Sequence, residues 1–218
     1  MRQVTVKLRS GWLAALLVSV VLAQPVSADS ALDAFLRELQ TSEAIHFSYH
    51  ETRHMALLQQ SWKTQGEMYI APQQMIVDQR QPSHTLTLIT AQRLDHLDLD
   101  ADRRFSREFD AQDAPGGISA LIALFSPTGN REALQQRFDM TFEQDAEHRR
   151  LLLQPRVAQR DVRRISIAVA ADHQTSHMTI DYWDGDSSEW NLTTTARGDP
   201  VVRSMDELMS QIRRHADN

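Results

Sequence analysis

The stretch that decides the fold is Ile45–Met55, which reads IHFSYHETRHM. Apolar and aromatic side chains occupy every second position at Ile45, Phe47 and Tyr49, and polar side chains lie between them. A period of two is typical of a β-strand with one face in a core and the other in water. We therefore expect a long, half-buried strand here.

The same alternation recurs along the chain in two blocks. Turn-forming residues such as Pro72 and Pro82 separate the segments and favour hairpin connections between antiparallel strands. The further predicted strands are at 62–71, 75–79, 84–90, 93–100, 103–109, 138–144, 148–156, 162–170, 177–184 and 188–196. The sequence thus predicts two antiparallel meanders, of about six and about five strands.

Helical spacing of apolar residues appears at the front, the middle and the end of this pattern. The expected helices are at 30–40, 118–125, 130–137 and around 204–214. Segment 118–125 (ISALIALF) has almost no polar face, so it is either a plug in the concavity of a curved sheet or an ordinary core helix. The class is mainly β with α (α+β), and periodicity alone leaves open a sandwich, a closed barrel and an incomplete barrel.

The first 28 residues have the pattern of a cleaved signal peptide. Arg2, Lys7 and Arg9 precede the apolar run 11–23, and Val26-Ser27-Ala28 offers the small residues that signal peptidase requires. Thirteen apolar residues are short of the ~20 that span a bilayer, although an uncleaved anchor is the alternative. We expect a single exported domain at 29–218, and the bacterial periplasm is the simplest destination.

Composition excludes several classes of function. Lys+Arg number 23 against 29 Asp+Glu, and Lys7 and Lys63 are the only lysines, which argues against a nucleic-acid partner. There is no cysteine, so disulfides, thiolate metal sites and cysteine nucleophiles are excluded. The sequence contains no GxSxG, HExxH, Walker A or GxGxxG motif, and we expect neither catalysis nor a cofactor.

The histidines of the first strand raise the question of a metal site. His46, His50 and His54 stand four residues apart. In a strand, residues four apart lie ~13 Å from each other, whereas Zn–N bonds are ~2 Å long. We therefore expect these histidines on the polar face of the strand, with no metal bound.

Glu51 and Arg53 are the more informative polar pair. Both have the parity of Phe47 and Tyr49, so a regular strand would direct them to the apolar face. Burial of opposite charges is costly unless they are paired, which suggests an ion pair at the rim of a cavity. The alternative is a strand end or bulge after Tyr49 that returns both side chains to solvent.

Several motifs in order resemble the LolA-type outer-membrane lipoprotein carrier family. They are FSYHETRHMALL at 47–58, QGEMYIAP at 65–72, GGISALIALFSPTGNREALQQRF at 116–138 and LLLQPRVAQRDVRRISIAV at 151–169. The resemblance covers about 31–195, and Glu51 to Leu58 (E-x-R-H-x-x-L-L) is similar to a divergent branch, some of whose members accompany lipid or polyene export. It implies an incomplete antiparallel β-barrel of about 11 strands with helices over a hydrophobic cavity.

The resemblance also implies a function. A non-catalytic carrier of this kind shields the acyl chains of a lipoprotein or (glyco)lipid, and passes its cargo from an inner-membrane donor protein to an outer-membrane acceptor. The alternative is a regulatory module of the same fold that grips a membrane-anchored protein. A shuttle is usually monomeric, so we expect a monomer.

The candidate cavity residues are apolar or aromatic, since such side chains offset the exposure of acyl chains to water. For each of them, plain core packing is the alternative. They are Phe47, Tyr49, Trp62, Met68, Met75, Ile118, Leu121, Ile122, Phe125 and Met140.

One position departs from the family pattern. In the well-studied carriers, a basic residue before the proline of the second strand's corner latches the lid, whereas this chain has Ala71 before Pro72. Our hypothesis is that Arg53 substitutes for this latch. The departure also raises the alternative that the cargo is a free lipid or glycolipid.

Overall fold

A computed structural model of the chain describes residues 28–39, 43–90, 92–108, 131–145, 147–156 and 162–215. In these ranges the helices are α1 (Ala28–Leu39), α3 (Arg131–Arg137) and α4 (Asp199–Arg214). The strands are β1 (Ile45–Met55), β2 (Gln60–Ala71), β3 (Gln74–Gln81), β4 (Thr85–Thr90), β5 (Arg93–Asp98), β6 (Arg103–Glu108), β7 (Phe138–Gln144), β8 (His148–Pro155), β9 (Val162–Ala170), β10 (Thr175–Tyr182) and β11 (Ser187–Arg197).

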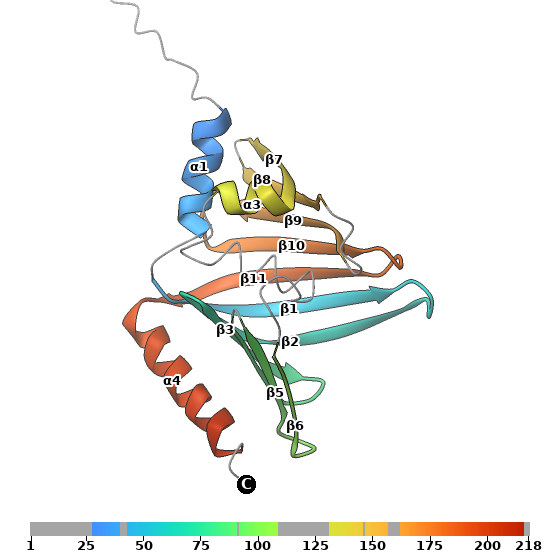
Figure 1. The fold of residues 1–218 in the computed structure, drawn as a ribbon, viewed down its shortest axis with the longest axis vertical. Helices are drawn as coiled ribbons and strands as arrows, with labels where there is room; N and C mark the ends of the chain where they lie inside the picture. The colour runs from blue at the N-terminus through green and yellow to red at the C-terminus, as the bar shows by residue number, and fades with distance from the viewer. Residues whose placement is uncertain are drawn as a thin grey trace, which may run out of the picture.

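All eleven strands belong to one open antiparallel sheet. Their order is β6-β5-β4-β3-β2-β1-β11-β10-β9-β8-β7, so each block is a meander and the two blocks join where β1 pairs with β11. The sheet curves strongly, with α1 and α3 at its β7–β9 end and α4 beside the other half (Figure 1). The predicted class, mainly β with an incomplete antiparallel barrel, is confirmed.

Strand β1 shows why the alternation specifies the face. Ile45, Phe47 and Tyr49 are buried, and the strand continues to Met55 with its only register shift between His46 and Phe47. We call the face that carries these three residues the inner face, and the opposite one the outer face. Since no bulge follows Tyr49, later odd-numbered residues of β1 remain on the inner face.

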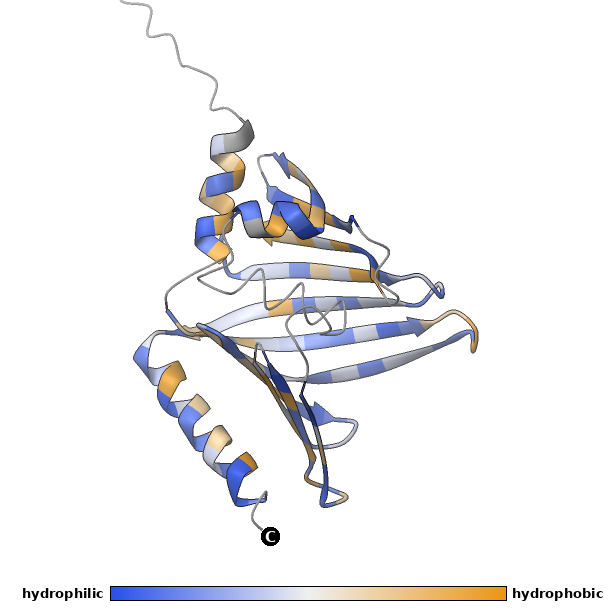
Figure 2. Ribbon diagram, in the orientation of Figure 1, coloured by the Kyte–Doolittle hydropathy of each residue, from blue (hydrophilic) through white to orange (hydrophobic). Residues whose placement is uncertain are grey.

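The two faces bury different clusters. The inner cluster gathers side chains of α1, α3 and most of the strands, including Phe35, Phe138 and Ile165. On the outer face, α4 covers β2 to β5 through residues such as Met205 and Ile212. Figure 2 shows the hydrophobic stripe that α4 turns toward the sheet, which explains how strands in this half are buried on both sides.

Helix α4 begins before the predicted residue 204. Val201 is buried against the sheet, and Pro200 stands at the start of the helix, where its missing N–H costs no hydrogen bond. The spacing of Met205, Leu208 and Ile212 predicted most of the helix correctly, but the prediction left out this first turn. The predicted helix at 118–125 and the predicted signal peptide, apart from its last residue Ala28 at the start of α1, lie outside the described residues. Within those residues, no helix is both long and apolar enough to cross a membrane.

Candidate functional site

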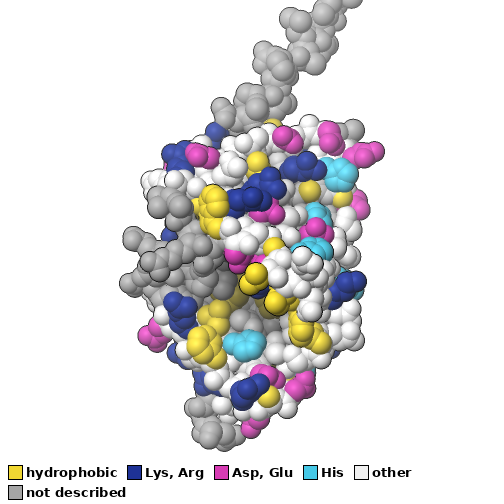
Figure 3. Space-filling view, turned by 90° about the vertical axis from the view of Figure 1, so that its right-hand side faces the viewer, with side chains coloured by type: hydrophobic (Ala, Val, Ile, Leu, Met, Phe, Trp, Pro, Cys, Tyr) yellow, Lys and Arg dark blue, Asp and Glu magenta, His cyan; other side chains and the backbone are white. Residues whose placement is uncertain are grey.

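The inner face carries the largest of three clusters of buried hydrophobic side chains in the described part of the chain. Both meanders and α1 contribute to it, which brings residues from Leu32 to Leu192 into one cluster. Figure 3 looks at the right-hand side of Figure 1, where the molecule is hollowed and hydrophobic side chains gather around the hollow. A concave site lined by apolar side chains is the usual setting for an apolar ligand.

The structure places five of the predicted cavity residues at the inner cluster. Phe47, Tyr49, Met68 and Met75 are buried in it, and Met140 packs against its margin. Trp62 has the same parity as Met68 but lies near the end of β2, where it is 53% exposed. The other four predicted cavity residues, Ile118, Leu121, Ile122 and Phe125, lie outside the described ranges.

Glu51 continues the inner face beyond the aromatic residues. The register places it opposite Thr64 on one side and Trp190 on the other. Thr64 donates a hydrogen bond to Glu51 Oε2 at 2.9 Å, and Ser188 also bonds the carboxylate. Burial nonetheless raises the pKa of Glu51 above its ordinary value, because desolvation outweighs these bonds.

Arg53 lies one pair further along β1 and is half exposed. Its guanidinium is 3.4 Å from the Asp186 carboxylate, and Cζ lies 5.3 Å from the centre of the Tyr182 ring. Within the described residues, Glu51 and Arg53 therefore have separate partners across the sheet. The hypothesis that Arg53 substitutes for the lid latch stays a prediction.

We call Glu51 and Arg53 the polar rim. Aromatic side chains separate this rim from the apolar interior. The Tyr49 and Trp190 rings are 5.1 Å apart, and burial raises the pKa of the Tyr49 hydroxyl well above its usual range. The Trp190 indole N–H is buried and has no hydrogen-bond partner in the ranges that the structure describes. It is one donor that a ligand at the inner face could use.

Sequence reasoning missed Thr64, Tyr182, Ser188 and Trp190 as members of this site. Parity alone would have grouped Trp190 with the buried Leu192. Nothing local indicates that β11 pairs with β1, since the two strands are more than 130 residues apart in the chain.

Helix α1 is held on the sheet by ion pairs as well as by apolar contacts. Arg149 donates to both Glu38 carboxylate oxygens, at 2.6 and 3.0 Å, and His173 also contacts Glu38. The Arg149 hydrogen bonds hold the pKa of Glu38 below its ordinary value. Near the middle of the helix, Arg131 donates to Asp33 at 3.1 Å. We call the Glu38, Arg149 and His173 group the α1 clasp.

The outer face carries the residues that the alternation assigned to solvent, together with α4. His46 stacks on Tyr69 at 4.3 Å and bonds Glu67 at 2.7 Å. No group of three or more His, Asp or Glu residues suited to a metal ion occurs in the described ranges. Ala71, the position of the family latch, is buried in the cluster under α4 that includes Met205, on the face opposite to the hollow.

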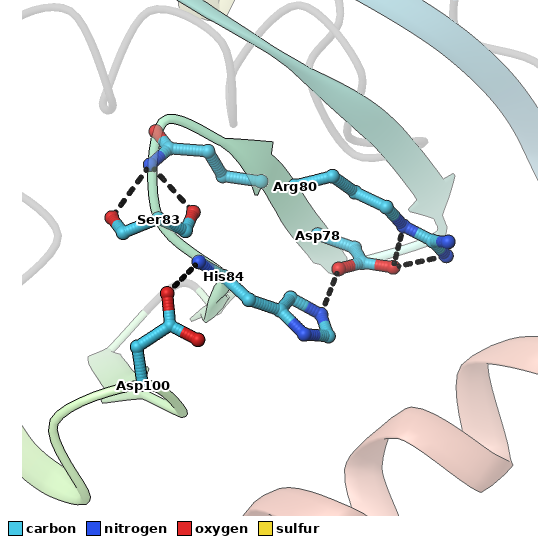
Figure 4. A network of polar contacts seen from close by, with 6 residues as sticks. Asp78, Arg80, Ser83, His84 and Asp100 are labelled. Carbon is cyan, nitrogen blue, oxygen red and sulfur yellow. Dashed lines mark hydrogen bonds and ion pairs between the residues drawn. The ribbon is translucent and has the colours of Figure 1, made fainter.

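A buried carboxylate fastens the β3–β4 connection near α4 (Figure 4). Asp78 is 2% exposed, accepts hydrogen bonds from Arg80 at 2.8 and 3.2 Å, and lies 2.9 Å from His84 Nε2. The His84 backbone N–H in turn donates to Asp100 at 2.8 Å. These bonds offset the cost of burying the charge, so the network has a structural role.

The outer face of β7–β10 also holds a hollow of about 410 Å³. Its lining mixes apolar residues such as Leu152 with the charged Glu143, Arg150 and Arg164. Such a lining suits an acyl chain less well than an apolar one, because the acyl chain would remove these charges from water.

Comparison with known proteins returned structural similarity only. No family model matches the chain, and no curated protein matches it. Similar solved structures include an uncharacterized conserved protein from Thermus thermophilus (7% identity, 77% of this chain and 88% of that chain, TM-score 0.43). They also include a putative outer membrane lipoprotein-sorting protein domain from Vibrio parahaemolyticus (8%, 77% and 90%, 0.40) and a LolA superfamily protein from Nitrosomonas europaea (8%, 76% and 92%, 0.34).

Proposed function

We propose that this chain is an exported, non-catalytic carrier that shields the acyl chains of a lipoprotein or (glyco)lipid at its inner face. The observation that carries the proposal is the inner cluster, which extends without a charged interruption from α1 across both meanders. A saturated chain of about sixteen carbons costs about 12 kcal/mol to expose to water, at ~0.8 kcal/mol per CH₂. A shuttle must offset most of this cost.

The polar rim suits the other end of such a cargo. Glu51, Arg53 and the Trp190 N–H offer an acceptor, a cation and a donor beside the aromatic residues. A head group or an acylated N-terminus carries polar groups that need such partners once water is displaced. The acyl chains would then lie on the apolar surface beyond Tyr49.

The signal peptide predicted at 1–28 supports export to the periplasm as part of the proposal. There a monomeric carrier would take its cargo from an inner-membrane donor and deliver it toward the outer membrane through an acceptor. We propose that two polar contacts hold the helices over the cargo. One is the α1 clasp, and the other is made by Arg53. Each of these two ion pairs has one partly exposed partner, Glu38 in the clasp and Arg53 at the rim, so solvent screens the pair and it can break and re-form.

Mass spectrometry of the protein purified from periplasm without detergent tests the proposal. We expect acylated cargo at close to one molecule per protein, and its loss in Met140→Glu, which places a charge at the margin of the inner cluster. Thr141→Glu is the matched control, since the next residue of β7 lies on the outer face. The proposal would be contradicted if the wild-type protein carried no cargo and also failed to bind an added fluorescent fatty acid.

A further inference from the structure

Two hairpin turns at one end of the sheet expose large hydrophobic side chains. Leu57 is 92% exposed and Leu58 58%, while Trp62 and Trp183 are 53% and 57% exposed. We call these four residues the tip patch. The hydrophobic β1–β2 turn stands out at the right-hand end of the ribbon in Figure 2.

The two turns are fixed side by side. Asp186, in the β10–β11 turn, accepts a hydrogen bond from the Ala56 backbone N–H at 3.0 Å and pairs with Arg53 at 3.4 Å. A Cβ on Gly185 would lie 3.3 Å from the Ala56 Cβ, so the turns are in van der Waals contact. Figure 1 shows both hairpin ends together, at the right of the molecule. The patch is therefore one preorganised surface.

We propose that the tip patch inserts into the surface of a lipid bilayer made of zwitterionic phospholipid. The four side chains expose on the order of 600 Å² together, which is less than the roughly 800 Å² that each partner contributes to a stable protein complex. A bilayer sets no such minimum, because any apolar side chain that enters it leaves water.

The order of residues along the hairpin also matches a membrane interface. Leu57 and Leu58 form the apex, and Trp62 lies beyond the last strand pair, Met55 with Gln60. Two residues of strand place Trp62 roughly 7 Å behind the turn. Leucine favours the hydrocarbon, while tryptophan favours the head-group level above it.

Charge decides between zwitterionic and anionic lipid. Around the patch, in 53–63 and 182–189, Arg53 and Lys63 are outnumbered by Asp184, Asp186 and Glu189, and the whole chain has a net charge of −6. An anionic surface would repel the protein. Insertion therefore depends on the apolar side chains and not on electrostatic attraction.

This inference rests on the proposed function and names the surface at which the carrier works. The patch adjoins the polar rim. Arg53 lies opposite Trp62 in the β1–β2 register and forms an ion pair with Asp186 in the β10–β11 turn. Docking by the tip would bring the rim, and the inner face beyond Glu51, against the lipid. Cargo could then move between bilayer and protein over a short path.

Vesicle sedimentation of the exported chain tests the inference. We expect binding to phosphatidylcholine vesicles, and a partition coefficient lowered about tenfold or more by Leu57→Ser with Leu58→Ser. Val202→Ser is the matched control, because Val202 is 44% exposed on α4, away from the tip. Vesicles that contain phosphatidylglycerol should bind no better than phosphatidylcholine alone.

Fatty-acid binding in solution, measured on the same variants, separates the two proposals. We expect the double serine variant to keep fatty-acid binding while it loses vesicle binding. Vesicle binding that survives the double substitution, or that requires phosphatidylglycerol, would overturn the inference. Vesicle binding through the tip by a protein that takes up no fatty acid would support the inference and contradict the carrier function alone.

Discussion

Gly66 is the residue at which the sheet tolerates no side chain. A bulge in the β2–β3 pairing lies between Gln65 and Gly66, and a Cβ on Gly66 would come within 2.1 Å of the Asp78 carbonyl oxygen. That distance is far inside van der Waals contact with backbone, which cannot rotate away. The close approach also lets Tyr49 lie opposite a position without a side chain.

We predict that Gly66→Ala lowers the free energy of unfolding by about 3 kcal/mol, because two strands must separate to accept the methyl group. Gln65→Ala is the comparison. Gln65 is the neighbouring residue of β2, is partly exposed and already carries a Cβ, so that change should cost less than about 1 kcal/mol. Urea unfolding of both variants checks this, and equal losses would contradict the account of the bulge.

Glu51 should make the protein less stable as pH rises. Its pKa is raised in the folded state, so between the ordinary value of 4.5 and the raised value the folded protein binds more protons than the unfolded one. Stability therefore falls as pH increases through that window and stays lower above it. We predict that Glu51→Gln, which can still accept the Thr64 bond, raises stability at pH 7 and flattens this part of the pH profile. A steeper fall in the variant would contradict the burial of the carboxylate.

At the scale of the element, α1 depends on its clasp. Glu38 has a lowered pKa, so its contribution is present above the ordinary value of 4.5 and is lost as pH falls through the folded value. We predict that Arg149→Met speeds hydrogen exchange in α1 while the sheet stays protected. Arg150→Met is the control, because its only ion pair in the described ranges is a 4.0 Å contact with Glu143 on the outer face. Equal exchange in the two variants would show that the clasp does not hold the helix.

Helix α4 should be an integral part of the β2–β5 half. Met205 is 1% exposed in the outer cluster, whereas Val202 is 44% exposed on the same helix. We predict that Met205→Ala costs about 3 kcal/mol in free energy of unfolding. Val202→Ala should change it by less than about 0.5 kcal/mol. Thermal unfolding distinguishes them, and a small effect at Met205 would mean that α4 is only loosely docked.

The strands were largely predictable because the alternation of apolar and polar residues shows which side chains of each strand face the core. Ile45, Phe47 and Tyr49 identify the inner face of β1, and Glu51 follows by parity alone. The alternation does not show which positions along a strand are covered by its neighbours. Trp62 shares the parity of Met68 but lies where β2 extends past the end of β3, which pairs with β2 only from Gln65 onward, so it is exposed.

Contacts between distant elements were beyond local reasoning. Arg53 was expected beside Glu51 but pairs with Asp186, which lies 133 residues further along the chain. The same is true of Trp190 beside Tyr49. Such contacts depend on which strands become neighbours, and alternation carries no information about strand order.

At the scale of the whole molecule, the sheet combines a dry face with a hydrophobic tip. The inner cluster would hold acyl chains, the rim at Glu51 and Arg53 would meet the polar end of the cargo, and the tip patch would meet a bilayer. The outer face has a different role, because α4 and the Asp78 network stabilise the half of the sheet opposite α1.

The central claim is that acyl chains bind at the inner face, and tryptophan quenching tests it most directly. Residues 29–218 contain three tryptophans, Trp62, Trp183 and Trp190, so Trp62→Phe with Trp183→Phe in this segment leaves Trp190 as the single probe, 5.1 Å from Tyr49. We predict that a brominated fatty acid, added in solution without vesicles, quenches Trp190 saturably. The reciprocal variant, Trp190→Phe, keeps only Trp62 and Trp183. If the fatty acid quenched this variant but left Trp190 unquenched in the single-probe variant, the claim would be contradicted.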